Sequence, residues 1–168
     1  MLVRRRTEDD LDQCIGLAAA VQARDGYPVH LDTDLRSFLV TDDARATWVA
    51  EHDGHIAGHV ALHRHTLPAV LAIASEALRR PVDQLGVVAR LLVDPDGRQR
   101  GTGRALLEAA TREARTLGLW PILDVCDRFG PAIALYERNG WVRGGQVSLR
   151  LDGREIVELV YLYAGPDD

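Results

Sequence analysis

The sequence predicts a mixed α/β fold, and three observations carry the prediction. Strand-like and helix-like runs alternate along the chain. The apolar, β-branched run Gly86–Val93 (GVVARLLV) is too short for an independent helix and is typical of a central strand covered on both faces. A glycine-containing loop then leads into a run of period 3.6, from about Thr102 to Leu117, which indicates a helix ended by Gly118. With 168 residues, no internal repeat and no boundary in composition, we expect one domain over residues 1–168.

The N-terminal part begins with a short strand and two helices. Leu2–Arg6 reads as the strand, and Thr7 as the N-cap of a helix with acidic residues in its first turn. Gly26 and Pro28 end that helix, and a second short helical pattern follows Asp32. The inner face of the first helix is expected to consist of Leu11, Cys14, Ile15, Ala18 and Val21.

Two strand-like runs follow, Thr47–Glu51 and His55–Arg64, and the Asp53-Gly54 pair between them is a strong hairpin signal. Because side chains alternate along a strand, the histidines of the second run are expected on the face opposite its apolar residues. We expect this histidine face to be wet or to line a cleft. Its members are His55, His59, His63 and His65.

The rest of the chain adds an apolar helix and a mixed ending. Pro68–Leu78 is almost continuously apolar, which predicts a mostly buried helix that serves as a lid over a site or as a dimer interface. Pro121–Cys126 reads as a strand, followed by a short helix between Pro131 and Gly140. The last two strands, 141–151 and 155–163, form a hairpin around Asp152-Gly153.

Composition argues against several classes of protein. The net charge of −5 lacks the basic excess that nucleic-acid binding requires. No run approaches about 18 uninterrupted apolar residues, and the opening MLVRRRTEDD leads into no apolar segment. We therefore expect neither secretion nor membrane insertion, but a cytoplasmic protein. Cys14 and Cys126 lie too far apart for a CxxC site and are interpreted as free buried thiols, which fits a reducing compartment.

The loop DPDGRQRGTG after the central strand carries the clearest chemical signal. Gly101 and Gly103 let the backbone approach a ligand, and amides at the helix N-terminus, with its partial positive charge, favour phosphate oxygens. Arg98, Arg100 and Arg104 add positive charge, so a pyrophosphate fits better than a carboxylate. The nucleotide motifs GxxxxGK(S/T) and GxGxxG are absent. Taken alone, the loop also fits a plain strand–helix turn with solvated arginines.

Two motifs stand in order along the chain. The run Arg98-Gln99-Arg100-Gly101-Thr102-Gly103, preceded by Val93 and Pro95, matches the pyrophosphate-loop pattern Q/R-x-x-G-x-G/A. Ala132–Trp141 (AIALYERNGW) looks like a segment A-I-x-L-Y-x-x-x-G-F. Together they resemble the GCN5-related N-acetyltransferase (GNAT) family, most strongly over Val87–Trp141. The resemblance implies a GNAT-like fold, with a central mixed, largely antiparallel sheet of about six to seven strands and helices on both faces.

The resemblance also implies acetyl-CoA as the cosubstrate. The backbone of Leu91, Leu92 and Val93 would then hydrogen-bond the pantetheine arm, and Tyr136 would protonate the departing thiolate. The pyrophosphate would lie against the amides of Arg98, Gln99, Arg100, Gly101, Thr102 and Gly103, beside Arg104. The chain departs from the family pattern at Phe129, where an Asn is frequent, and at Val87, where histone-acetylating members have a glutamate base.

The general base must therefore be sought elsewhere. An amine with a pKa near 10.4 is almost wholly protonated at pH 7, and only its neutral form attacks a thioester. Candidates are Asp124, Glu76, and His63 or His65, and Asp124 joins Tyr136 as the predicted catalytic pair. His63 and His65 lack a third ligand at zinc spacing, so no metal is expected.

The predicted function is direct transfer of an acetyl group from acetyl-CoA to a primary amine in a ternary complex. The alternatives are a non-catalytic acyl-CoA-binding regulatory module, and a transferase that uses another acyl-CoA or an alcohol acceptor. The acceptor is a small-molecule or peptide amine, open among amino acids, antibiotics, polyamines and protein N-termini. Arg90, inside the central strand, either binds an acceptor carboxylate or pairs with an acid such as Asp124. Family resemblance also suggests a homodimer.

Overall fold

The computed structural model describes residues 1–29, 34–98 and 100–165. These residues form two compact units. Unit one comprises Met1–Leu62 and Val88–Glu113, and unit two comprises His63–Val87 and Ala114–Asp168. The strand β4 (Leu85–Val93) belongs to both, because its first three residues lie in unit two and the rest in unit one.

Within the described residues, seven strands form one sheet in the order β1-β2-β3-β4-β5-β7-β6. The β4–β5 pair is parallel, whereas the β1–β2, β5–β7 and β6–β7 pairs are antiparallel. The predicted mixed, largely antiparallel sheet is therefore confirmed. Besides β4, the strands are β1 (Leu2–Arg5), β2 (Ala44–His52), β3 (His55–His63), β5 (Trp120–Cys126), β6 (Trp141–Leu151) and β7 (Arg154–Tyr163).

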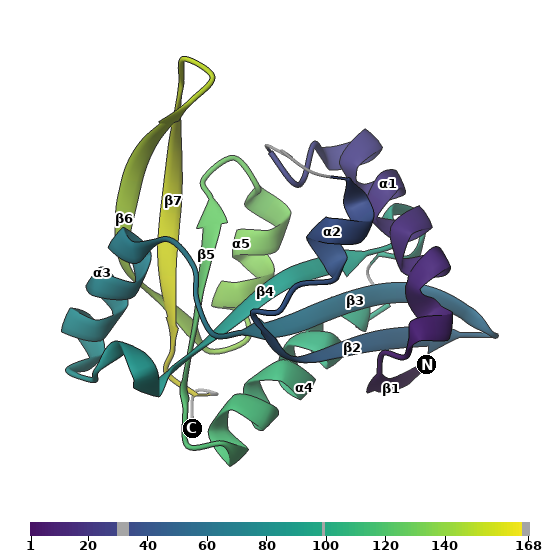
Figure 1. Ribbon diagram of the computed structural model, residues 1–168, viewed down its shortest axis with the longest axis horizontal. Coiled ribbons are helices and arrows are strands. Elements are labelled where there is room, and N and C mark those ends of the chain that lie inside the picture. The colour runs from purple at the N-terminus through teal and green to yellow at the C-terminus, as the bar shows by residue number, and fades with distance from the viewer. Residues whose placement is uncertain (30–33, 99, 166–168) are drawn as a thin grey trace. The chain divides into compact units, whose positions relative to one another are not determined.

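Helices cover both faces of the strands of unit one. α1 (Leu11–Asp25) and α2 (Leu35–Leu39) lie on one face and α4 (Thr102–Thr116) on the other (Figure 1). The predicted inner face of α1 is confirmed, with Ile15 partly buried at its edge. The core between α1, α2 and the strands consists of Leu11, Cys14, Leu17, Ala18, Val21, Phe38, Leu39, Val49, Ile56 and Leu92.

The helix start predicted at Thr7 is confirmed, with a 3-10 turn (Glu8–Asp10) leading into α1. The Thr7 backbone N–H donates to Asp10 Oδ2 at 2.7 Å, which satisfies a donor that has no partner inside the helix. Arg4 donates Nη1 and Nη2 to the two oxygens of the same carboxylate at 2.8 Å each, and also binds Glu51 of β2. These hydrogen bonds, from Arg4 first, hold the pKa of Asp10 well below its usual range. The network joins β1, β2 and the start of α1.

Both predicted hairpin turns are confirmed. Asp53 and Gly54 have φ values of 50° and 81°, and Asp152 and Gly153 have 50° and 74°. Two consecutive positive φ values give the type I′ turn, whose twist matches that of the flanking antiparallel strands. Asp followed by Gly adopts this conformation at low cost, which is why the dipeptide identified the turns.

The expectation of a wet histidine face on β3 is wrong for two of its members. His59 is fully buried and His63 is 4% exposed, whereas His55 and His65 are exposed. His59 is covered because it hydrogen-bonds to the Arg90 carbonyl on β4 and to Arg6, whose guanidinium also binds the Leu39 carbonyl at the end of α2.

Unit two carries the strands β5, β6 and β7 and the helices α3 (Pro68–Leu78) and α5 (Gly130–Glu137). α3 has the predicted bounds and packs on β6 and β7. Val70, Leu71 and Ala74 are buried, and a Cβ atom at Gly145 of β6 would lie 2.7 Å from Ile73 Cγ2. Much of the apolar side of α3 is thus covered within its own unit. That α3 serves as a lid over a site, or as a dimer interface, stays a prediction.

Both cysteines are buried free thiols, as predicted. Burial raises the pKa of the Cys14 thiol to about 11, and burial is also the main cause that raises the pKa of Cys126. Among the described residues, no helix combines the length and the apolar character needed to cross a bilayer.

Candidate active site

The glycine loop of unit one ends in an open helix N-terminus. After β4, a 3-10 turn (Pro95–Gly97) and Gly101, with a φ of 80°, lead into α4 at Thr102. The Gly101 carbonyl accepts from Ala105 N–H at 3.0 Å, so it closes the first turn of the helix. The amides of residues 102–104 precede any possible intrahelical acceptor. Gln99, one of the predicted loop residues, lies outside the described part of the chain.

The space at Gly101 fits the group that the sequence predicts. A Cβ atom placed there would meet no heavy atom within 4 Å, yet the positive φ strains any side chain. An open, side-chain-free surface beside helix amides and a partial positive charge suits an anion such as a pyrophosphate. Of the two residues that follow, Thr102 is 2% exposed and its Oγ1 lies 3.4 Å from His52 Nε2, and Gly103 is also buried.

Gly58 on β3 is a part of this site that the sequence did not reveal. A Cβ atom at Gly58 would lie 2.6 Å from Leu106 Cδ1 and 2.9 Å from Thr102 Cγ2, both in α4. The absence of a side chain therefore lets the first turns of α4 lie directly against β3. A glycine inside an apolar strand is the signal of such a close approach.

The three arginines of the loop, which were predicted to add positive charge for a pyrophosphate, differ in their contacts. Arg98 donates to Asp25, the last residue of α1, with Nη1 to Oδ1 at 3.1 Å, and this contact raises the arginine's pKa. Arg104 donates Nε to Glu108 Oε1 at 2.8 Å, one helical turn away. Arg100 is exposed. Two of the three charges are thus already paired within unit one.

In the C-terminal part of β4, Leu91 and Val93 are half-buried and Leu92 is buried. The register of β4 with β5 covers Leu85 to Val87. Arg90 has a left-handed φ of 55°, and its guanidinium lies 4.3 Å from the centre of the Phe38 ring and donates Nε to the Phe38 carbonyl at 3.2 Å. These contacts of Arg90 are with α2, and its predicted roles, with an acceptor carboxylate or with an acid such as Asp124, stay predictions.

Tyr136, the predicted general acid, lies on α5 in unit two and is 7% exposed. Its ring centre is 6.3 Å from that of Trp141 and 6.2 Å from that of Tyr161. Tyr161 donates its hydroxyl to Glu137 Oε1 at 2.8 Å, and burial, together with this hydrogen bond, raises the pKa of Tyr161 to about 12. Tyr136 therefore sits in an aromatic cluster with a fixed orientation.

Asp124, the predicted base, lies on β5 in the same unit. It accepts a hydrogen bond from Thr66 Oγ1 at 2.7 Å, just before α3, and its partner on β7 is Val160. Tyr161, against which Tyr136 packs, is the next residue along β7 and points to the other face, because side chains alternate. The structure thus places Asp124 and Tyr136 in one unit but on opposite faces of its strands.

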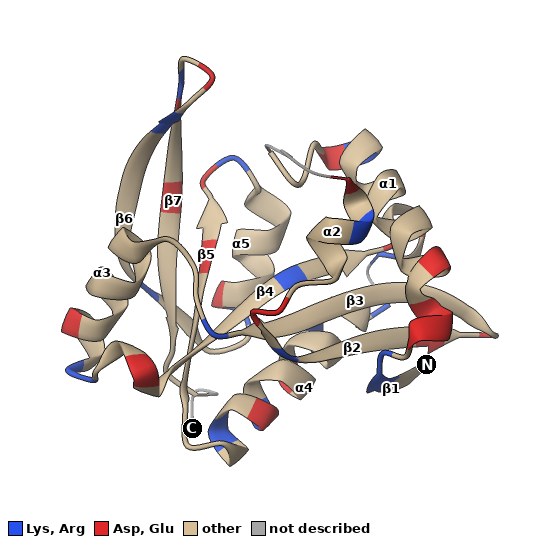
Figure 2. Cartoon of the chain, in the orientation of Figure 1, with Lys and Arg blue, Asp and Glu red and all other residues tan. Residues whose placement is uncertain are grey.

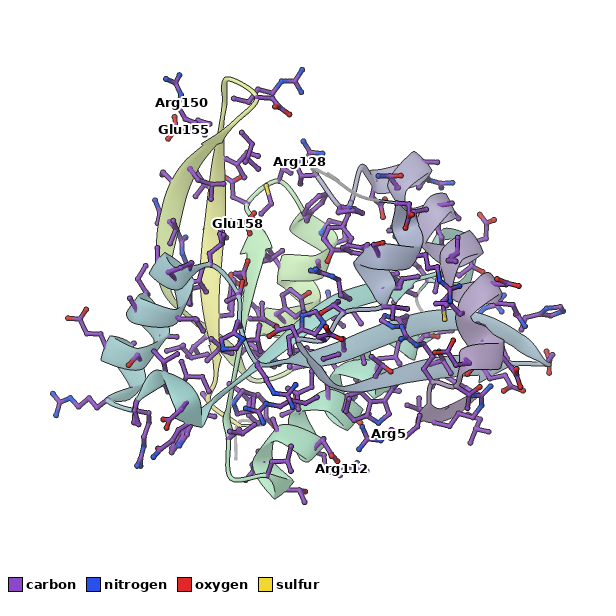
Figure 3. The ribbon with its side chains drawn as sticks, viewed as in Figure 1. Arg5, Arg112, Arg128, Arg150, Glu155 and Glu158 are labelled. Atoms are coloured by element: carbon purple, nitrogen blue, oxygen red, sulfur yellow. The ribbon has the colours of Figure 1, made fainter. Side chains whose placement is uncertain are left out.

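Glu158 was not among the predicted site residues. It lies on β7 opposite Cys126, so the acidic residues of β5 and β7 neighbour one another (Figure 2), and Figure 3 labels its side chain on β7. Burial first, then the negative charges of Asp124 and Asp127, raises its pKa to about 7. The available signal was alternation, since Ile156 and Val160, on the same face of β7, are both buried.

The other candidates for the base differ in accessibility. Glu76 is exposed on α3, His65 is exposed, and His63 is buried. Within the described residues, no group of three or more His, Cys, Asp or Glu side chains is arranged to hold a metal ion.

The chain shares its fold with several solved structures that are named as acetyltransferases. The ribosomal-protein-S18-alanine N-acetyltransferase from Escherichia coli has a TM-score of 0.68 at 20% identity, with 99% of this chain and 96% of that chain covered. The ribosomal-protein-alanine N-acetyltransferase from Brucella melitensis has a TM-score of 0.71 at 19% identity, with coverages of 96% and 98%. A Salmonella typhimurium structure, solved with its cofactor acetyl-CoA, has a TM-score of 0.71 at 15% identity, with coverages of 100% and 95%.

Sequence comparison identifies the family directly. No curated protein matches this chain. A family model described as an acetyltransferase (GNAT) domain matches residues 43–143, which include the glycine loop and both predicted catalytic residues. This match covers more than half of the sequence, and the structural likeness extends over nearly all of it. The chain therefore belongs to the GNAT family of acetyltransferases.

Proposed function

We propose that the protein transfers the acetyl group of acetyl-CoA to a primary amine by direct transfer in a ternary complex. The observation that carries the proposal is the open backbone at Gly101, at the N-terminus of α4, within the family's pyrophosphate-loop sequence. Family membership and the acetyl-CoA in the Salmonella typhimurium structure support the choice of donor.

Unit one supplies the groups that would hold the donor. The amides of Thr102, Gly103 and Arg104, with Arg100 and Gln99 nearby in sequence, would bind the pyrophosphate, and the backbone of residues 91–93 would bind the pantetheine arm. Arg98 would contribute by fixing the loop to α1 through Asp25 rather than as a free cation.

Unit two supplies the two proton-transfer groups. Bound acetyl-CoA provides a thioester carbonyl as the acetyl source. Asp124 would accept the proton that the amine loses as it attacks, and Tyr136 would donate its phenolic proton to the departing thiolate. Because these two residues lie on opposite faces of the strands, the thioester would have to lie between them, with the amine approaching from the side of Asp124. A phenol near pKa 10 and a thiol near 8.5 differ by roughly 2 kcal/mol, which positioning can offset. The neighbouring Glu158 carboxyl adds to a negative environment that favours a cationic acceptor over an anionic one.

Calorimetric titration with acetyl-CoA tests the cofactor site. Gly101→Glu fills the cradle and repels phosphate, so its binding should fall below detection. Gly118→Glu is the matched control, because Gly118 also has a positive φ, 73°, with open space around it, at the far end of α4. Equal loss in both variants, or no binding by folded wild-type protein, would reject the cofactor site.

An amine panel tests turnover. Tyr136→Phe and Asp124→Asn should retain acetyl-CoA binding and lose most of the transfer rate, on the order of 100-fold each. Tight binding without turnover on any amine would favour the non-catalytic regulatory module. Competition by longer thioesters, or product formation with alcohols, would favour the other transferase.

A further inference from the structure

The left-handed residue in β4 lies at a sensitive position. Arg90 has a φ of 55°, a conformation that L-residues other than glycine rarely adopt and that asparagine and aspartate tolerate better than arginine. It directly precedes Leu91, the first of the residues proposed to bind the pantetheine arm. The direction of the chain at Arg90 therefore determines where the backbone groups of residues 91–93 point.

A buried histidine holds the carbonyl of this residue. His59 on β3 is fully buried, and its Nδ1 lies 2.9 Å from the Arg90 carbonyl oxygen. Its Nε2 lies 3.1 Å from Arg6 Nη1. A carbonyl only accepts and a guanidinium only donates, so Nδ1 carries the hydrogen and Nε2 accepts. The neighbours thus fix both the tautomer and the orientation of the ring.

The same network reaches α2. Arg6 Nη1 also donates to the Leu39 carbonyl at 2.8 Å, and Arg90 donates to the Phe38 carbonyl and covers the Phe38 ring. Both carbonyls belong to the C-terminal end of a helix, where no intrahelical donor remains. The side chains of Arg6 and Arg90 thus cap the C-terminal end of α2. The left-handed kink at Arg90 is therefore part of a connected, partly buried polar network.

We infer that His59 is a positioning residue, which holds the left-handed kink at Arg90 through its Nδ1–H and thereby aims the backbone of residues 91–93 at the donor's arm. The inference rests on the proposed acetyl-CoA site. It assigns His59 no contact with either substrate. The proposed transfer chemistry does not require His59 to be buried or to make these two hydrogen bonds. The positioning role accounts for both.

Steady-state kinetics of two His59 variants provide the first test. His59→Leu removes both hydrogen bonds at similar volume, whereas His59→Asn keeps an N–H donor at the position of Nδ1. His55→Leu, at an exposed site on the same strand, is the control. We expect His59→Leu to raise KM for acetyl-CoA about tenfold and leave KM for the amine unchanged, and His59→Asn to recover most of the loss. A fall in kcat alone, or equal effects in the Leu and Asn variants, would indicate a merely structural role and overturn the inference.

A second variant isolates the kink. Glycine adopts a positive φ without strain, so Arg90→Gly added to His59→Leu should restore acetyl-CoA affinity toward that of Arg90→Gly alone. Additive losses in the double variant would contradict the inference, because two residues that act on one backbone conformation cannot be independent.

Nitrogen NMR of the wild-type protein gives a readout that does not depend on the variants folding or on cofactor binding. The ¹⁵N chemical shifts of the two ring nitrogens of His59 should show a neutral ring that is protonated at Nδ1, which is the less common tautomer of a free histidine. A charged ring or the Nε2–H form would overturn the inference. Failure of wild-type protein to bind acetyl-CoA would instead reject the proposed function and leave this signature unchanged, so the two failures are distinguishable.

Discussion

Glu158 lies diagonally across the β5–β7 pair from Asp124, since Glu158 is opposite Cys126 and Asp124 is opposite Val160. Side chains in this relation share one face of the sheet and are close enough for their charges to interact. The pKa of Glu158 is about 7 in the folded protein against 4.5 ordinarily, mainly because the carboxyl is buried and secondly because Asp124 repels its charge. Two carboxyl groups so placed do not ionise independently.

The raised pKa of Glu158 predicts a pH-dependent stability. Its stabilising contribution is complete below about pH 4.5 and is lost as pH rises through about 7, because the folded state then holds a buried charge. Glu158→Gln should match wild type near pH 4.5 and exceed it at pH 8 by on the order of 2–3 kcal/mol in the free energy of unfolding. Urea denaturation at both pH values measures the difference. Glu155→Gln, at an exposed site on the same strand and labelled in Figure 3, is the control and should show no such gain.

Asp10 should behave in the opposite sense. Its depressed pKa means that its contribution is present above about pH 4 and is lost as pH falls, when the carboxylate that Arg4 and Thr7 bind becomes protonated. Asp10→Asn should lower the free energy of unfolding at pH 7 by about 1 kcal/mol, less than is usual for hydrogen bonds to charged groups, because Arg4 is partly exposed. Acid titration of the unfolding free energy checks this. A constant difference between the two proteins down to pH 2 would rule out the charge as the cause.

Two glycines of unit one should respond oppositely to alanine. At Gly58 the added Cβ would clash with Leu106 and with Thr102, and α4 would have to shift, at a cost of about 1–3 kcal/mol. At Gly16, inside α1, the Cβ meets nothing within 4 Å, so Gly16→Ala should stabilise by about 0.5–1 kcal/mol. Thermal unfolding of both variants provides the comparison, and destabilisation by Gly16→Ala would contradict the packing described for α1.

The ion pair between Arg98 and Asp25 allows the role of Arg98 to be separated from simple phosphate binding. If Arg98 anchors the loop to α1, then Arg98→Ala and Asp25→Asn should weaken acetyl-CoA binding to a similar degree, and the double variant should be no worse than either. A far larger loss in Arg98→Ala would show direct contact with phosphate. Titration calorimetry on the four proteins of this cycle decides between the two.

Elements with local signals could be predicted from the sequence. Pro68 and Gly26 mark a helix start and a helix end, and the two Asp-Gly turns require only positive φ at consecutive residues. The pyrophosphate loop was recognisable for the same reason, because its glycines and the following helix are contiguous in sequence. Family membership followed from the order of two such local motifs.

Features that depend on distant partners could not be predicted. His59 is held in its buried position by hydrogen bonds to Arg6, 53 residues earlier, and to Arg90, 31 residues later. Arg98 is paired with Asp25, 73 residues away, and its neighbours in the loop give no sign of this partner. Glu158 looks like an ordinary acidic residue until β5 brings Asp124 onto the same face. The sequence of a strand shows that one of its residues is charged, but it does not show which residues of the neighbouring strands will lie beside that charge.

The close contact of β3 with the first turns of α4 limits what can be transplanted. A designer who grafts the hexapeptide of residues 98–103 onto another strand–helix junction would carry over the glycines but not the missing side chain at position 58. In the new scaffold an ordinary strand residue would push the helix away and tilt its amides. A functional graft therefore needs a recess in the adjoining strand as well as the loop.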